Sequence, residues 1–194
     1  MGELAEAIEI LTKGGIVIFP TDTAFGIGCR IDDEDAIRRL FKLRKRSETK
    51  AVPVLVSSLH MAQRYVKQMP QDVISTLIKP YWPGALTIVL QAKIEKVPSL
   101  VRGGGEKIGV RAPDHLTTQA LINGVGVPIL GTSANFAGEA TPYTFESLDE
   151  ELKKLVDFVV PGECFGGKTS TVIDCTVTPW KILRQGAIRL KIED

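Results

Sequence analysis

Segments of helical and strand periodicity alternate along most of this chain, and the alternation limits the folds open to it. Apolar residues recur at helical spacing up to Lys13, and a short apolar run follows over residues 15–19. The same succession continues to Val160, so helices are expected to cover the faces of a sheet. The tail from Ser170 holds β-rich pieces without helical spacing, which favours antiparallel pairing at one end. We therefore predict an α/β fold with a twisted mixed parallel/antiparallel sheet and flanking helices.

Residue types at the segment ends refine this prediction. The expected helices have capping side chains at Asp32 or Asp33, at Ser57 or Ser58, and at Asp114. A longer helix is expected over residues 146–155. The expected strands are short and rich in β-branched residues, and they cover residues 15–19, 52–56, 85–91, 107–111, 127–130, 156–160, 171–174, 181–184 and 188–192.

Length and charge restrict the class of protein. The chain has 194 residues and a formal net charge of +1, so we expect residues 1–194 to form a single domain. Non-specific nucleic-acid binding needs a clear basic excess, which this composition lacks. The sequence contains neither the apolar run of a membrane helix nor the features of a signal peptide in residues 1–13. We expect a cytoplasmic protein.

The metal-ligating residue types are few and scattered. Two histidines and three cysteines occur, and none of them has the spacing of a zinc site or of a redox cysteine pair. No metal site made by the protein alone is predicted. Any metal is expected to arrive with a phosphate substrate.

One short motif suggests a phosphate-binding loop. Gly162, Gly167, Lys168 and Thr169 match the pattern GxxxxGK[ST]. That loop works only when a helix begins at the lysine, because the first backbone amides of the helix hold the phosphate. The residues that follow, 170–174, are β-branched and have poor helix propensity. The match is therefore interpreted as a glycine-rich turn between strands.

Cations and hydroxyls recur where predicted strands begin or end. In open α/β sheets, ligands bind outside the carboxyl ends of the strands. Charged residues that only face solvent on separate surfaces would not all be expected at the ends of strands. The recurrence therefore favours one site for an anionic ligand. The residues concerned are Thr21, Asp22, Thr23, Arg44, Lys45, Arg46, Lys50, Arg111, Thr132, Ser133, Asn135 and Arg184.

Together these segments resemble the YrdC family of threonylcarbamoyl-AMP synthases. The resemblance is carried by seven ordered motifs over nearly the whole chain: PTDT with GIG at 20–28, the RKR...K segment at 44–50, WPGALT at 82–87, VRAPDH at 110–115, TSAN at 132–135, STVID at 170–174 and LRQGAI at 183–188. It implies a twisted α/β sheet around a concave, positively charged cavity, in the short single-domain form. Arg44 and Arg46 stand at the KxR pair of the family, Phe25 where tyrosine is common, and Leu55 where some relatives carry histidine.

The resemblance implies a reaction in which L-threonine, bicarbonate and ATP give threonylcarbamoyl-AMP and pyrophosphate, for the t6A modification of tRNA. The nucleophile is an anionic carbamate. The residues that the resemblance assigns to the site are therefore implied to act electrostatically, above all Arg46 and Lys50. Mg²⁺ would enter with ATP. The implied ATP-binding residues are Arg44, Arg46, Lys50, Lys107, Gly131, Ser133, Asn135, Thr141 and Arg184. The implied threonine-binding residues are Thr23, Leu55, Arg111 and Ser170.

The implied partner is a downstream tRNA threonylcarbamoyltransferase complex, and direct contact with tRNA stays open. Two other functions remain as alternatives. The first is an RNA-binding module without catalysis, although the basic segment at 44–50 lacks the aromatic residues on which bases stack. The second is a carbamoyltransferase-type hydrogenase maturation domain, which shares the fold.

Overall fold

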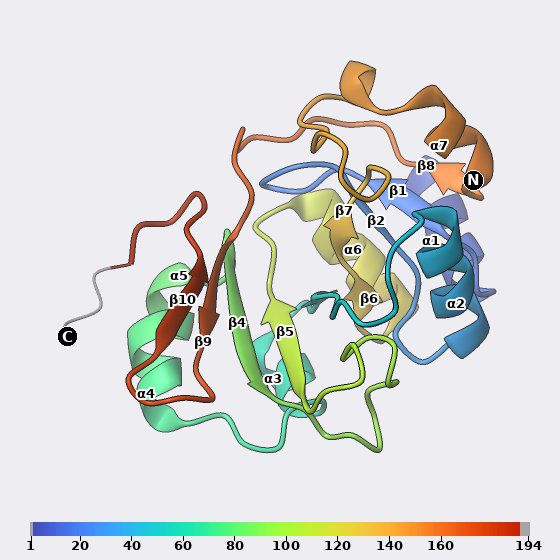
Figure 1. Ribbon diagram of the computed structural model, residues 1–194. Coiled ribbons are helices and arrows are strands. Elements are labelled where there is room, and N and C mark those ends of the chain that lie inside the picture. The colour runs from blue at the N-terminus through green and yellow to red at the C-terminus, as the bar shows by residue number, and fades with distance from the viewer. Residues whose placement is uncertain (1, 191–194) are drawn as a thin grey trace.

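The computed structural model describes residues 2–190 and contains two mixed β-sheets (Figure 1). The four-stranded sheet has the order β7-β2-β1-β8, and the six-stranded sheet has the order β10-β9-β4-β5-β3-β6. The strands of the first are β1 Val17–Phe19, β2 Gly26–Gly28, β7 Thr132–Ser133 and β8 Phe158–Val159. Those of the second are β3 Val54–Leu55, β4 Leu86–Gln91, β5 Lys107–Arg111, β6 Ile129–Leu130, β9 Thr171–Asp174 and β10 Lys181–Arg184.

Helices pack around the sheets (Figure 1). The helices are α1 Glu3–Thr12, α2 Glu34–Leu43, α3 Leu59–Gln63, α4 Gln71–Val73, α5 Lys79–Tyr81, α6 Leu116–Val125 and α7 Glu150–Leu155, with a π-helix over Ile74–Ile78 and a 3₁₀-helix over Phe145–Ser147. Within the described residues, no helix is long and apolar enough to cross a membrane. The predicted α/β class is confirmed. The expectation of a single domain stays a prediction.

The prediction of one sheet is wrong, because the strands divide into two. Parallel pairs (β1 with β8, β3 with β5, β4 with β9) and antiparallel pairs occur together, so the mixed character is confirmed. Periodicity finds strands but does not say which strands pair, since pairing joins segments far apart in the chain. Here β1 pairs with the following β2, and β2 pairs with the distant β7.

Several local predictions can be compared with the element ends. Asp33 and Ser58 cap α2 and α3, with side chains that accept from Ala36 N at 2.9 Å and Met61 N at 3.1 Å. Asp114 does not cap α6; the N-cap residue is His115, and its side chain makes no capping bond.

Two longer segments also differ from the prediction. The helix expected over residues 146–155 is divided, because Asp149 starts α7 with a capping bond of its own. Of the strand expected over 188–192, residues 188–190 are not in a strand and 191–192 lie outside the described residues.

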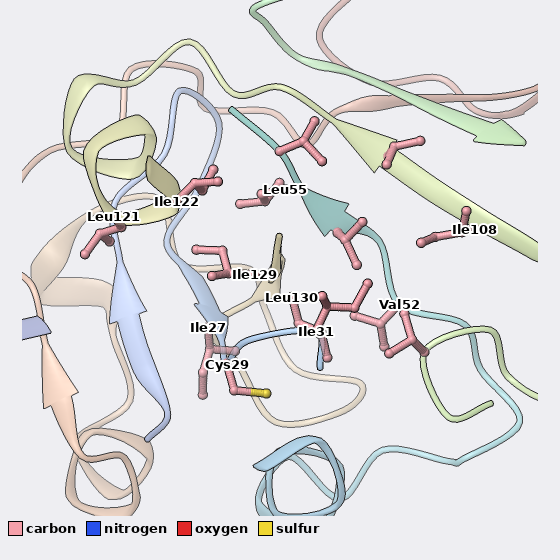
Figure 2. Close-up of a cluster of buried hydrophobic side chains, with 14 of the residues drawn as sticks. Ile27, Cys29, Ile31, Val52, Leu55, Ile108, Leu121, Ile122, Ile129 and Leu130 are labelled. Atoms are coloured by element: carbon pink, nitrogen blue, oxygen red, sulfur yellow. The ribbon is translucent and has the colours of Figure 1, made fainter. Parts of the chain in front are cut away.

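The two sheets meet where β2 ends against β6. Cys29, which follows β2, accepts a hydrogen bond from Leu130 N at 2.8 Å, and Arg30 forms an isolated bridge with Ile129. Figure 2 shows the side chains of Ile27 and Cys29 beside Ile129 and Leu130, and all four side chains are buried. One apolar core therefore joins both sheets, and it fixes their relative position because buried side chains pack at high density.

Gly28 permits this junction, and its replacement by alanine is expected to destabilise the fold. A Cβ atom at Gly28 would lie 1.8 Å from the Leu130 carbonyl oxygen, so one backbone would have to move. Overpacking of this kind costs about 3 kcal/mol of unfolding free energy. Urea unfolding would measure the loss. Gly105→Ala is the matched control, because the nearest atom to its Cβ would be 3.5 Å away; equal stability of both variants would contradict the prediction.

Candidate functional site

A cavity of about 810 Å³, including the part open to solvent, lies where loops from both sheets converge. Most side chains predicted from the sequence line it, although they are far apart in the chain. They are Thr23, Arg46, Leu55, Arg111, Gly131, Ser133, Thr141, Ser170 and Arg184.

The ends of the strands explain this convergence. Strand β5 ends at Arg111 and β10 ends at Arg184, while Ser133 is the last residue of β7. Thr23 lies in the connection between β1 and β2. Rigid strand ends therefore place the polar groups, and the short connections carry the remaining contacts.

Arg111 lines the cavity and is held by three acceptors. Its Nε donates to the Gly84 carbonyl oxygen at 3.0 Å, its Nη1 donates to Thr23 Oγ1 at 2.9 Å, and its Nη2 donates to the Asp22 carboxylate. The side chains of Arg111 and Asp22 are only 8% and 11% exposed. Three of the five N–H groups of the guanidinium are therefore used by the protein, and the other two can bind a ligand.

Arg184 is held against β9 at the cavity. Its Nε and Nη2 donate to the carbonyl oxygen and the Oγ of Ser170, both at 3.0 Å. The Ser170 hydroxyl is also 2.9 Å from Thr87 Oγ1. Burial, followed by repulsion from Arg111, lowers the pKa of Arg184. An anionic ligand between these arginines would relieve that repulsion.

Arg46 reaches the cavity from the loop after α2. Its Nη2 donates to the Ala51 carbonyl oxygen at 2.8 Å, but its Nε is buried and has no hydrogen-bond partner within residues 2–190. Burial also lowers the pKa of Arg46. A buried donor left unpaired is costly, so an acceptor from a ligand would stabilise this side chain.

Arg44 does not line the cavity, contrary to the direct ATP contact implied by the sequence. The side chain is buried, and it donates to Asn135 O at 2.9 Å, Thr132 Oγ1 at 2.7 Å and Asn135 Oδ1 at 3.1 Å. Burial and the neighbouring Arg46 charge lower its pKa to about 10. Asn135 likewise lies behind the cavity, where its Oδ1 accepts from Ser133 Oγ at 2.6 Å. Arg44 thus supports the loop that presents Ser133.

Two lysines carried over from the resemblance also lie outside the cavity lining. Lys50 is exposed in the loop that precedes β3. Lys107 begins β5, four residues before Arg111, which at the rise of a strand is a separation of about 13 Å. Its Nζ donates to the Asp174 carboxylate at 2.9 Å. Lys107 is therefore left out of the proposed site.

Lys107→Ala tests this exclusion. We expect turnover of the proposed reaction to stay within about twofold of the unchanged protein, since the lysine lies at the far end of its strand. Stability should fall by no more than about 1 kcal/mol, because Lys107 is 44% exposed and the Asp174 carboxylate keeps two hydrogen bonds from Thr176. Steady-state kinetics with ATP would measure the rate, and a rise of ten-fold or more in the KM for ATP would return Lys107 to the site.

Some cavity residues were not assigned from the sequence, among them Pro53, Thr87 and Thr169. Thr87 lies inside the motif WPGALT, so the motif was the available signal. Thr169 belongs to the segment that matches a phosphate loop. The structure agrees with the interpretation of that segment as a turn, because strand β9 follows it directly.

Known proteins resemble this chain over nearly its whole length, including the residues that line the cavity. Residues 9–186 match the family model of Sua5, YciO and YrdC, described as "Telomere recombination". The chain is 31% identical over 187 residues to a threonylcarbamoyl-AMP synthase of Bacillus subtilis, covering 96% of this chain and 54% of the relative.

Two solved structures are similar. Sua5 of Pyrococcus abyssi complexed with L-threonine has a TM-score of 0.87 at 31% identity, over 94% of this chain and 54% of that one. Escherichia coli YciO has a TM-score of 0.84 at 29% identity, over 94% and 88%. The chain thus spans about half the length of the synthases compared and most of YciO. The family match covers nearly the whole chain, and this protein belongs to the Sua5/YciO/YrdC family.

Proposed function

We propose that this chain is a threonylcarbamoyl-AMP synthase, which joins L-threonine, bicarbonate and ATP with release of pyrophosphate. The observation that carries the proposal is one cavity lined by three arginines, of which only one has a carboxylate partner among the described residues. Arg46 and Arg184 line it without an ion pair among residues 2–190, and Arg111 lines it with its carboxylate partner Asp22. Relatives named for this activity, and a similar structure with L-threonine, support the assignment.

The ATP phosphates are assigned to Arg46 and Arg184. Planar guanidinium groups bind phosphate through paired donors, and both side chains have donors to spare. Two full positive charges without carboxylate partners among residues 2–190 give the cavity an excess of positive charge, which a triphosphate would neutralise. Hydroxyls and amides of Ser133, Gly131 and Thr141 would orient the nucleotide. Arg44 and Asn135 act behind this surface.

The threonine carboxylate is assigned to the two free N–H groups of Arg111. Thr23, which accepts from Arg111, and Ser170, which accepts from Arg184, both line the cavity and can bind the polar groups of the amino acid. Leu55 is buried at 2% exposure and supplies an apolar wall, which suits the threonine methyl group. The cavity would thus bind both the carboxylate and the methyl group of threonine.

The chemistry needs positioning and charge neutralisation. The threonine amine attacks the bicarbonate carbon, a carbon–oxygen bond breaks, and the oxygen leaves as water with the proton that the nitrogen gives up, which yields the carbamate. One carbamate oxygen then attacks the α-phosphorus of ATP, and the bond to pyrophosphate breaks. The nucleophile is already anionic, so no protein base is required in the second step. A pair of like unit charges at about 4 Å repel by about 4 kcal/mol at an effective dielectric of 20, and the arginines offset this repulsion.

Mg²⁺ is proposed to enter with ATP. Among residues 2–190, no group of three or more histidine, cysteine, aspartate or glutamate side chains could hold a metal ion. The donor set that remains is the triphosphate itself, which is a usual Mg²⁺ ligand. When bound, the ion would supply further charge neutralisation. We also propose that the protein acts in the cytoplasm and that a tRNA threonylcarbamoyltransferase complex uses the product.

The test is release of pyrophosphate by the purified protein with ATP and Mg²⁺, in four reactions that contain threonine, bicarbonate, both or neither. We expect release only when both are present, because the carbamate is the nucleophile. Equal pyrophosphate release with and without threonine and bicarbonate would contradict the proposed reaction. An RNA affinity that falls with salt and does not change with ATP, in a protein that releases no pyrophosphate, would favour an RNA-binding module instead.

A further inference from the structure

The side-chain amide of Asn135 is held in one orientation by a partner on each side. Its Oδ1 accepts from Arg44 Nη2 at 3.1 Å, and a guanidinium can only donate. Its Nδ2 donates to the Glu139 carbonyl oxygen at 2.7 Å, and a carbonyl oxygen can only accept. Exchange of the amide oxygen and nitrogen would break both hydrogen bonds, so these partners fix the orientation of the amide.

This orientation determines how the Ser133 hydroxyl can bind a ligand. Ser133 Oγ lies 2.6 Å from Asn135 Oδ1, which only accepts, so the single proton of the hydroxyl is donated to Asn135. Among residues 2–190, no group donates to Ser133 Oγ in return. Ser133 is half-buried and lines the cavity. Its hydroxyl therefore offers lone pairs to a ligand and has no free proton to donate.

A hydroxyl that only accepts distinguishes the donating groups of the substrates from the phosphate groups. An ionised phosphate oxygen has no proton, so it could bind Ser133 Oγ only if the hydroxyl turned away from Asn135. That turn would break the hydrogen bond of 2.6 Å. The adenine, the ribose and threonine all carry N–H or O–H groups, which can donate to Ser133 without any rearrangement.

We propose that Asn135 sets the specificity of Ser133: because Asn135 holds the Ser133 proton, the hydroxyl binds an N–H or O–H group of a substrate and does not bind a phosphate oxygen. The inference rests on the proposed function and deepens it, since it names the kind of substrate group that Ser133 contacts. Asn135 acts through Ser133 and is a positioning residue. Arg44 and Glu139 act one step further back, by holding the amide of Asn135.

Calorimetry with ATP, L-threonine and inorganic tripolyphosphate, each titrated alone and without Mg²⁺, tests this proposal without turnover. The pH is set high enough to ionise the last hydroxyl of tripolyphosphate, so that this probe can only accept. In Ser133→Ala, the substrate that donates to the serine should bind about fivefold more weakly, the effect of one hydrogen bond, while the tripolyphosphate affinity should change by less than about twofold. ATP and threonine are titrated separately, so the result also identifies which of them donates.

Asn135→Ala supplies a gain that a merely structural role of Asn135 cannot produce. Release of the Ser133 proton should let the hydroxyl donate to phosphate, so tripolyphosphate should bind about tenfold more tightly, as expected for a hydrogen bond to a charged acceptor. Addition of Ser133→Ala to this variant should remove the gain. Ser75→Ala is the matched control, because Ser75 Oγ donates to the Asp72 carbonyl oxygen at 3.2 Å outside the cavity lining. It should leave all three affinities unchanged.

Three results would overturn the proposal. They are an equal loss of ATP and tripolyphosphate affinity in Ser133→Ala, no change of any affinity in that variant, and an unchanged tripolyphosphate affinity in folded Asn135→Ala. Should Asn135→Ala not fold, Ser133→Ala decides alone, since its loss leaves Asn135 Oδ1 bonded to Arg44. Absence of pyrophosphate release by the unchanged protein would defeat the proposed function alone, because the role of Ser133 is judged by binding.

Discussion

Arg46→Ala is expected to lower the rate of pyrophosphate release by at least about 100-fold, the loss that follows removal of one preorganised donor to a developing charge. Arg46 lines the cavity, and its buried Nε has no partner within the described residues. The only hydrogen bond that the guanidinium makes within those residues goes to the Ala51 carbonyl oxygen. The variant should therefore lose turnover and keep its fold.

Steady-state rates and urea unfolding of the same preparation would separate these two effects. Arg38→Ala is the matched control, because Arg38 is an arginine of α2 whose side chain is 57% exposed and pairs with Glu34. We expect its rate to equal that of the unchanged protein. Normal turnover in a folded Arg46→Ala protein would refute the assignment of this arginine to the phosphates.

Arg44→Ala is expected to lower the unfolding free energy by about 3 kcal/mol, because a buried, charged donor then leaves several acceptors unpaired. Asn135 O, Asn135 Oδ1 and Thr132 Oγ1 would all lose the guanidinium. The loop that presents Ser133 would lose its support, so the protein that remains folded should also turn over slowly.

Lys42→Ala is the control for this prediction, since Lys42 is an exposed cation of the same helix, and surface substitutions usually change stability by less than about 0.5 kcal/mol. Urea unfolding would measure both variants. If Arg44→Ala unfolds at the same urea concentration as Lys42→Ala, Arg44 does not support the loop. A raised KM for ATP, with stability unchanged, would also contradict the structural role.

The local elements of this protein follow from its sequence. The spacing of apolar residues predicted most strands, and β5 begins and ends where expected, at Lys107 and Arg111. Asp33 caps α2 as predicted because the capping bond is made within three residues. Such features depend on neighbours in the chain, so a pattern of residues is sufficient to predict them.

The division into two sheets and the contents of the cavity were decided by the tertiary structure. Arg44 and Arg46 are two residues apart and chemically identical, yet only Arg46 lines the cavity, while Arg44 turns toward Asn135. Lys107 and Arg111 share one strand but lie at its opposite ends, and Asp22 pairs with Arg111 only where β5 delivers that arginine to it. The sequence by itself determined residue types, periodicities and motif order. Which charges meet was decided by contacts between distant segments, because burial and pairing depend on positions that periodicity does not encode.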